Sequence, residues 1–263
     1  AAGRLRDVTI AYPGATSLAI GNGASSAAVV RGDLSVISGG SISNWSGYLS
    51  LNGASSTSNF TAGGNITLND SRNYLGAVTV NPAKDALSVD LYNNSGNANL
   101  TILPTAGNLA GAITNLSLVQ PNASLTLAAN QVKGNLYINN QGGTLTNNTL
   151  TVAAQTLNGS MDLRAENGIT ATGDWNVHTT ANLNNTSGLA LDTYKISVGG
   201  ATTLTAGAGI GDISLDNPLN NINNVTVISG RDLTLKSAYN IGGVTIDLPQ
   251  AAGRLRDVTI AYP

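Results

Sequence analysis

Charged side chains are the groups of this chain that could do chemistry, and they are sparse. Only 10% of the 263 residues are charged, with Lys+Arg 12 and Asp+Glu 14. Glycosidases need two carboxylates about 5–10 Å apart, and many lyases need acids around calcium. Asp212 and Asp216 only flank one predicted strand, and Glu166 is the single glutamate. Acids from adjacent coils could still align, but we expect no catalytic residue, no cofactor and no enzyme.

Metal sites are also not expected. The chain has no cysteine, and His178 is its only histidine, so neither a thiolate site nor a histidine set can form within it. The segment Gly207–Leu215, GAGIGDISL, is similar to a calcium-binding nonapeptide. It lacks the tandem copies that build half-sites on successive turns, so a wide turn is the favoured interpretation.

Two groups of residues could bind a partner. Arg31-Gly32-Asp33 spells the integrin tripeptide, but Gly32-Asp33-Leu34 is also one copy of a corner that recurs along the chain. The corner is the favoured interpretation. Trp45 and Tyr48 stand outside the aliphatic pattern and are candidate surface contacts for glycans or a neighbouring fibre; filling a corner is the alternative.

Asparagine followed two residues later by Ser or Thr is frequent, as at Asn44, Asn65, Asn115, Asn147 and Asn224. These are potential glycosylation sites. A chain this rich in Asn, Ser and Thr produces such triplets by composition alone. Asparagines at equivalent corners of stacked coils would have a second use, because their amides can form hydrogen-bonded ladders.

The elements that position these residues are short strands. Aliphatic residues alternate with Ser or Thr, which places the two kinds on opposite faces of a strand. No segment sustains a helical period over ten residues. Examples of the triplets are Val8–Ile10, Leu34–Val36, Ile66–Leu68, Val78–Val80, Leu116–Leu118, Leu136–Ile138, Leu150–Val152, Ile213–Leu215, Val225–Val227 and Leu233–Leu235.

One turn type precedes many of these strands. A small residue or Arg is followed by Asp or Asn and then an aliphatic residue, as in Gly64-Asn65-Ile66 and Arg231-Asp232-Leu233. Such residues suit tight corners. Repeated corners predict an all-β, right-handed parallel β-helix (a β-solenoid), with about 20 residues per coil and roughly 55–60 Å of rod per 250 residues. The alternative is a set of antiparallel β-sandwich repeats.

The chain carries the same thirteen residues twice. Ala1–Pro13 and Ala251–Pro263 both read AAGRLRDVTIAYP. We interpret residues 1–250 as one full solenoid repeat and residues 251–263 as the start of the next identical repeat. An engineered overlap or a circular permutation is the alternative.

The repeated segment is predicted to form the junction where repeats stack end to end. Val8 and Ile10, and again Val258 and Ile260, would point inward, while the corner would hold Arg4, Arg6 and Asp7 and again Arg254, Arg256 and Asp257. Segments Gly39–Ser58 and Pro104–Pro121 break the strand rhythm most, so we expect them to protrude.

The overall charge and hydropathy exclude several partners. A formal net charge of -2 offers no footprint for nucleic acid. No apolar run approaches the roughly 18 residues of a membrane span, so membrane insertion is not expected.

Two stretches resemble the repeat regions of filamentous-haemagglutinin-like large exoproteins, the two-partner-secretion adhesins of bacteria. They are Thr203–Val227, TLTAGAGIGDISLDNPLNNINNVTV, and Asn59–Val80, NFTAGGNITLNDSRNYLGAVTV. The resemblance implies a parallel β-helical fibre, extracellular or on the bacterial cell surface, that serves adhesion, aggregation or biofilm scaffolding. Its partners would be other copies, end to end and laterally, and glycans or host or cell surfaces. A carbohydrate- or receptor-binding module on an adhesin stalk is the alternative, and a β-helical polysaccharide-active enzyme a remote one.

Overall fold

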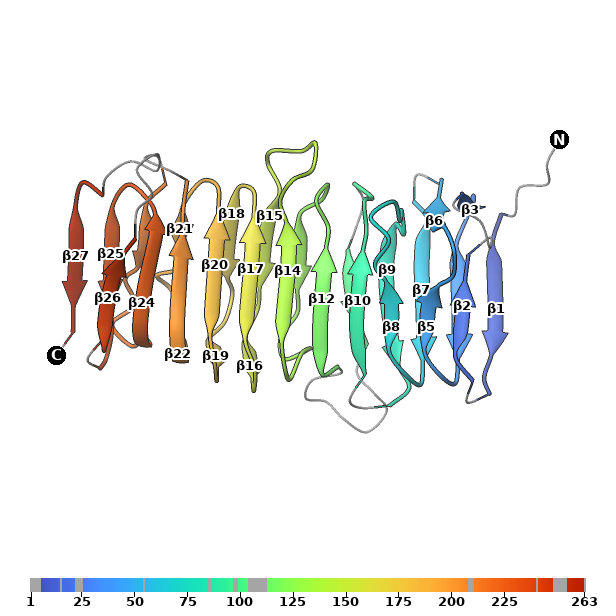
Figure 1. Cartoon of the computed structure of the whole chain (residues 1–263), viewed down its shortest axis with the longest axis horizontal. Helices are drawn as coiled ribbons and strands as arrows, with labels where there is room; N and C mark the ends of the chain where they lie inside the picture. The colour runs from blue at the N-terminus through green and yellow to red at the C-terminus, as the bar shows by residue number, and fades with distance from the viewer. Residues whose placement is uncertain are drawn as a thin grey trace.

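The protein is a rod of stacked parallel strands (Figure 1). The computed structural model describes residues 6–14, 16–21, 26–53, 55–84, 87–96, 99–103, 113–207, 211–239, 241–247 and 255–262. Every regular element among them is a β-strand, and every pair of neighbouring strands is parallel. The prediction of an all-β parallel solenoid is therefore confirmed, and the antiparallel sandwich is wrong.

One side of the rod, here called the first wall, takes one strand from each coil. Its 5-, 3- and 4-stranded sheets follow one another, because β11 contacts β13 and β18 contacts β21. The strands are β1 (Val8–Tyr12), β4 (Leu34–Ser38), β7 (Thr57–Ala62), β9 (Ala77–Pro82), β11 (Leu100–Ile102), β13 (Leu125–Leu127), β15 (Thr149–Val152), β18 (Gly168–Ala171), β21 (Leu189–Ala190), β23 (Ile213–Leu215), β25 (Leu233–Lys236) and β27 (Val258–Ala261).

The opposite side, the second wall, is part of one 13-stranded sheet. It contains β2 (Leu18–Ile20), β5 (Ile42–Asn44), β8 (Ile66–Leu68), β10 (Ser88–Tyr92), β12 (Asn115–Val119), β14 (Leu136–Asn140), β17 (Met161–Ala165), β20 (Ala181–Asn185), the later parts of β22 (Ile196–Thr205) and β24 (Asn221–Ser229), and β26 (Gly243–Ile246). Four short strands complete the coils at the ends of the walls: β3 (Ala27–Val30), β6 (Tyr48–Leu51), β16 (Gln155–Leu157) and β19 (Trp175–Val177).

The coils are slightly longer than predicted. Ten successive register steps lead from Leu18 to Val244 along the second wall, which gives about 23 residues per coil rather than 20. With neighbouring strands about 4.8 Å apart, 250 residues correspond to about 53 Å of rod.

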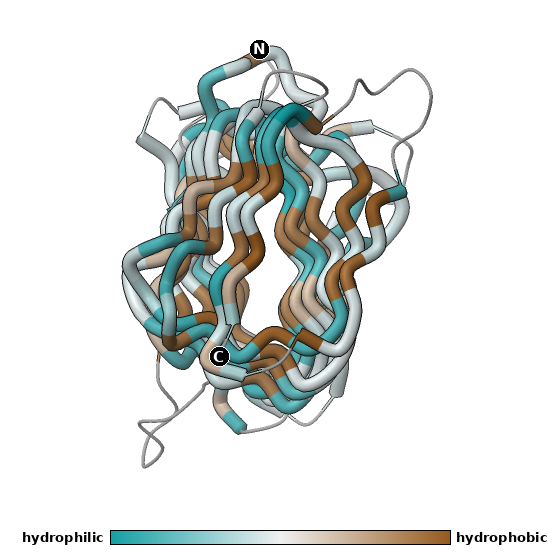
Figure 2. Tube along the Cα trace, turned by 90° about the vertical axis from the view of Figure 1, so that its left-hand side faces the viewer, coloured by the Kyte–Doolittle hydropathy of each residue, from teal (hydrophilic) through white to brown (hydrophobic). Residues whose placement is uncertain are grey.

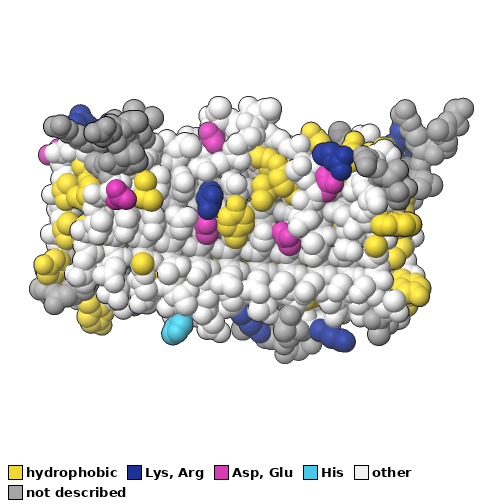
Figure 3. Space-filling view, viewed as in Figure 1, with side chains coloured by type: hydrophobic (Ala, Val, Ile, Leu, Met, Phe, Trp, Pro, Cys, Tyr) yellow, Lys and Arg dark blue, Asp and Glu magenta, His cyan; other side chains and the backbone are white. Residues whose placement is uncertain are grey.

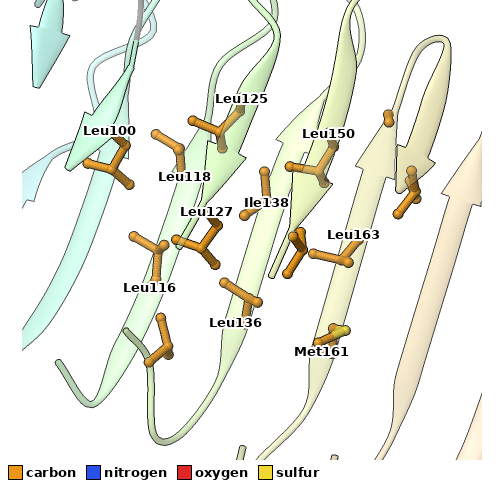
Figure 4. Packing of buried hydrophobic residues seen from close by; sticks show 14 of the residues in the cluster. Leu100, Leu116, Leu118, Leu125, Leu127, Leu136, Ile138, Leu150, Met161 and Leu163 are labelled. Atoms are coloured by element: carbon orange, nitrogen blue, oxygen red, sulfur yellow. The ribbon is translucent and has the colours of Figure 1, made fainter. Parts of the chain in front are cut away.

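Aliphatic side chains from the two walls fill the interior. Seen along the axis, hydrophobic residues recur at the same place in coil after coil (Figure 2). In Figure 4, Leu116, Ile138 and Leu163 of the second wall point toward Leu125, Leu127 and Leu150 of the first, and all six are at most 2% exposed. Each such side chain contributes roughly 1.5–3 kcal/mol when fully buried, so the alternation seen in the sequence generates the core.

One of the two expected protrusions, Gly39–Ser58, is wrong. Residues 39–58 contain β5 and β6, which lie in register within the coils. Residues 104–112 are outside the described part of the chain, and the rest of Pro104–Pro121 contains β12. The loop of residues 141–148 between β14 and β15 stands out instead (Figure 1), with Leu145 49% exposed. Gly142 lies in this loop at φ +82°, a backbone conformation that glycine adopts readily.

Candidate functional site

The repeated segment forms the last strand of the first wall at each end of the rod, and at the two ends opposite edges of this strand are open. At one end, β1 pairs only with β4, with Val8 beside Leu34 and Ile10 beside Val36. At the other end, β27 pairs only with β25, with Val258 beside Leu233 and Ile260 beside Leu235. Each terminal strand therefore leaves one row of backbone groups without a strand partner among the described residues.

The apolar interior is open at the first of these ends. Val8 and Ile10 pack against the core cluster, and together with Ile20, Val30 and Leu49 they line a hollow of about 240 Å³. At the far end the corresponding residues Val258 and Ile260 are 46% and 37% exposed. Both ends thus expose apolar surface that a further coil would cover.

Aspartates at one corner connect successive coils through backbone amides. The N–H of Asp33 donates to Oδ1 of Asp7 over 2.9 Å, and the N–H of Thr57 donates to Oδ1 of Asp33 over 2.8 Å. At the far end the N–H of Asp257 donates to Oδ1 of Asp232 over 3.3 Å. The corner that precedes the first-wall strands is therefore the same structure at both ends.

Arginines accompany these aspartates. Nε of Arg231 donates to Oδ1 of Asp212 over 2.7 Å, and this hydrogen bond holds the pKa of the Asp212 carboxyl below its usual value. The Arg256 guanidinium lies 3.5 Å from the carboxylate of Asp232. Arg6 and Arg31 line an open hollow at the other end. The predicted corner residues Arg4 and Arg254 are outside the described residues.

Trp45 and Tyr48 belong to an aromatic corner that the sequence pattern only partly predicted. Trp45 is 63% exposed, and the Arg72 guanidinium lies 4.7 Å from the centre of the Tyr48 ring. Tyr74, 42% exposed, forms an isolated bridge with Ser50. Charged and hydrophobic side chains also lie close together on the face seen in Figure 3. Pairing of Ser50 with Tyr74 could not be read from spacing, because it depends on the coil length.

Arg31-Gly32-Asp33 has a structural role. A Cβ at Gly32 would lie 1.9 Å from Oδ1 of Asp7 and 2.7 Å from the backbone oxygen of Arg6, so the position has no room for a side chain. The Asp33 carboxylate accepts hydrogen bonds from the N–H and from Oγ1 of Thr57. The tripeptide thus forms the stacked corner, as the favoured interpretation predicted.

The residues weighed for catalysis and metal binding do not converge. Asp212 pairs with Arg231 and Asp216 with Lys236, at opposite ends of β23. His178 is exposed at the corner after β19. Residues 208–210 of the segment similar to a calcium nonapeptide are outside the described part of the chain. Within that part, no group of three or more His, Asp or Glu side chains is placed to hold a metal.

Asparagines form the expected ladders. Oδ1 of Asn115 accepts from the N–H of Asn135, and Oδ1 of Asn135 accepts from the N–H of Ser160, both over 2.9 Å. Oδ1 of Asn65 accepts from the N–H of Ser88. By contrast, Asn147 is exposed in the protruding loop. Asn65 and Asn115 therefore have a structural use that needs no modification.

The fold and its stacked corners define the protein as a parallel β-solenoid repeat protein. A family model described as "Repeats of unknown function (DUF5649)" matches residues 5–81, 143–195 and 192–229. These ranges cover more than half of the chain, and the chain belongs to that family. No curated protein and no solved structure matches it. Within the described residues, no helix is long and apolar enough to cross a membrane.

Proposed function

We propose that the chain is a shaft-forming unit of a long extracellular or cell-surface fibre that serves adhesion, aggregation or surface scaffolding. One observation carries the proposal: the same strand sequence lies at both ends of the rod, and at each end it leaves a different edge open. Stacked hydrogen bonds and an aliphatic interior would carry load along the axis. Other copies of the unit are the proposed partners, and no catalytic step is part of this function.

The surface supports this proposal. Corners and outward positions are mostly uncharged Ser, Thr and Asn, and the few charges pair locally, as Arg72 does with Asp70 and Arg164 with Asp162. Such a surface gives no strong field for a charged polymer. The resemblance to filamentous-haemagglutinin-like exoproteins supports a bacterial surface location.

The test is electron microscopy of chains with one, two and three successive copies of residues 1–250, each followed by residues 251–263. We expect straight, unbranched rods that lengthen by about 53 Å per added copy. Compact particles or beads joined by gaps would contradict the proposal.

A second candidate function is carbohydrate binding at the aromatic corner. The observations that favour it are the 63% exposure of Trp45 and the Tyr48 ring, which lies 4.7 Å from the Arg72 guanidinium. Flat rings with polar neighbours offer an apolar surface to a partner that also carries hydroxyls. Saturable binding in a glycan panel that is lost in Trp45→Ala but kept in Tyr239→Ala, an exposed aromatic elsewhere, would support it.

A further inference from the structure

The repeated segment bonds to its neighbours through different backbone groups at the two ends. Toward β4, the Arg6 carbonyl accepts from the N–H of Gly32, the N–H of Val8 donates to the carbonyl of Asp33, and the Tyr12 carbonyl accepts from the N–H of Gly39. The Asp7 carboxylate accepts from the N–H of Asp33 as well.

The far end uses the remaining groups of the same sequence. Toward β25, the N–H of Arg256 donates to the carbonyl of Arg231, the Asp257 carbonyl accepts from the N–H of Leu233, and the Ala261 carbonyl accepts from the N–H of Ser237. The N–H of Asp257 also donates to Asp232. None of these groups has its counterpart among those that bind β4, so one copy of the segment can bond on both sides at once.

From this geometry we propose that β27 of one copy can replace β1 of a second copy, in the β1 register. Val258 would then lie beside Leu34 and Ile260 beside Val36, as Val8 and Ile10 do within a chain. The strand would keep its bonds to β25 of its own chain. Separate copies would thereby join head to tail with the 250-residue period of a covalent array. The inference rests on the proposed function and adds its mode of non-covalent assembly.

The exchange creates no new kind of contact. The incoming strand makes the bonds that the displaced β1 made, and the exposed Val258 and Ile260 become covered. Exchange of identical elements is a low-cost route to assembly, and a strand added to an open edge gains backbone hydrogen bonds. The β1 strand of the same chain competes with the incoming β27 and has the advantage of being tethered. The fraction of exchanged copies should therefore increase with protein concentration.

Cysteine pairs report the register, because the chain has no cysteine of its own. In the exchanged assembly, Thr259 lies beside Ser35; in a simple stack, with β27 placed on an undisplaced β1, it lies beside Thr9. Register partners about 4.8 Å apart fall within the Cα separation of a disulfide. We expect the T259C/S35C chain to form disulfide-linked oligomers and the T259C/T9C chain to form few or none.

The duplicated sequence supplies a matched pair of variants. Ile10→Asn weakens β1, which competes with the incoming strand, and should lower the concentration at which oligomers appear by about tenfold or more. Ile260→Asn, the same change in β27, should abolish the oligomers. Circular dichroism verifies that both variants remain β-folded.

Cross-linking only in T259C/T9C, or no cross-linking in either chain, would overturn the exchange. So would equal oligomerisation of the Ile10→Asn and Ile260→Asn variants. The fibre proposal fails separately, when covalent tandem copies do not form a continuous rod. A continuous tandem rod without cross-linking of separate copies would leave the fibre standing and exclude the exchange.

Discussion

The two halves of the rod contain the same turn at different corners. In the N-terminal half the turn follows β8. The buried Asn73 accepts from the N–H of Leu49 over 2.9 Å and donates to the carbonyl of Leu68 over 2.9 Å. This one amide therefore joins two coils and closes its own turn.

In the C-terminal half the turn follows β23. The buried Asn220 accepts from the N–H of Ile196 over 2.8 Å and donates to the carbonyl of Leu215 over 3.1 Å. In both turns the side chain three residues before this asparagine accepts from the backbone N–H two residues after itself: Asp70 from Arg72 and Asn217 from Leu219.

The turn lies at a different position within the coil in the two halves. In the N-terminal half the chain passes from the second wall through the turn and Tyr74 to β9 of the first wall. In the C-terminal half it passes from the first wall through the turn and the start of β24 to the second wall. The short strands follow the second wall in one half (β3, β6) and precede it in the other (β16, β19). The same turn therefore follows the second wall in the N-terminal half and the first wall in the C-terminal half.

The shift falls between the first and the second of the three ranges that the family model matches. Residues 82–142 lie outside the match. Among their described residues, an isolated bridge between Ile113 and Val132 stands where other coils have one of the short strands. Strand triplets and turns are therefore enough to form a coil. The order in which the corners follow one another determines whether a triplet lies in the first or the second wall.

The largest expected effect comes from emptying the core of one half. Phe60 and Leu183 are both 0% exposed, one in each half. Phe60→Ala should cost about 3–5 kcal/mol and Leu183→Ala about 2–5 kcal/mol of unfolding free energy. Because each coil contacts only its neighbours, hydrogen exchange should accelerate mainly in the half that carries the change. Equal acceleration in both halves would show that the destabilisation is not confined to the half that carries the substitution.

Glycine corners should respond unequally. A Cβ at Gly211 would lie 1.6 Å from the backbone oxygen of Ser187, whereas one at Gly64 would lie 2.6 Å from the Ser41 hydroxyl, which can rotate. We expect Gly211→Ala to cost about 3 kcal/mol and Gly64→Ala about 1 kcal/mol in denaturant unfolding. Gly14→Ala is the control, since nothing lies within 4 Å of its Cβ position. A greater loss in Gly64→Ala than in Gly211→Ala would contradict the expected difference between the two corners.

Because the two turns make the same hydrogen bonds, removing either asparagine should lower the free energy of unfolding by the same amount. Asn73→Ala and Asn220→Ala each leave a buried backbone N–H and a carbonyl unpaired, at a cost of about 2–3 kcal/mol. Urea titration of both variants measures the loss, with the exposed Asn147→Ala as a control that should stay within about 0.5 kcal/mol. A stable Asn220→Ala beside an unstable Asn73→Ala would show that the two turns are not equivalent.

The smallest effect is a difference in acid response. The side-chain hydrogen bond from Arg72 lowers the pKa of Asp70 in the folded protein, whereas the equivalent Asn217 does not titrate. A lowered folded pKa stabilises the protein above the unfolded value of about 3.9, and this stability is lost as the pH falls below it. Asp70→Asn should change stability at pH 7 by less than about 0.5 kcal/mol. It should also reduce the loss between pH 5 and pH 3, measured by thermal melts.

Much of the fold could be predicted from local sequence, because alternation decides which residues face the core and Gly-Asp or Gly-Asn decides where the chain turns. The corner role of Asp33 followed from the same pattern. The aromatic corner and the shift between walls could not be predicted. Both depend on coil length, which varies from 19 to 27 residues with the corners, and one residue more or less changes which side chains stack.

The distance between spin labels at Ser43 and Thr245 tests the continuous rod most directly. Both lie on the second wall, and nine register steps separate them. Labels on S43C/T245C should give a single narrow distribution near 43 Å, at about 4.8 Å per step. A distribution centred well below this distance would show that the two halves fold back on each other and would contradict the account.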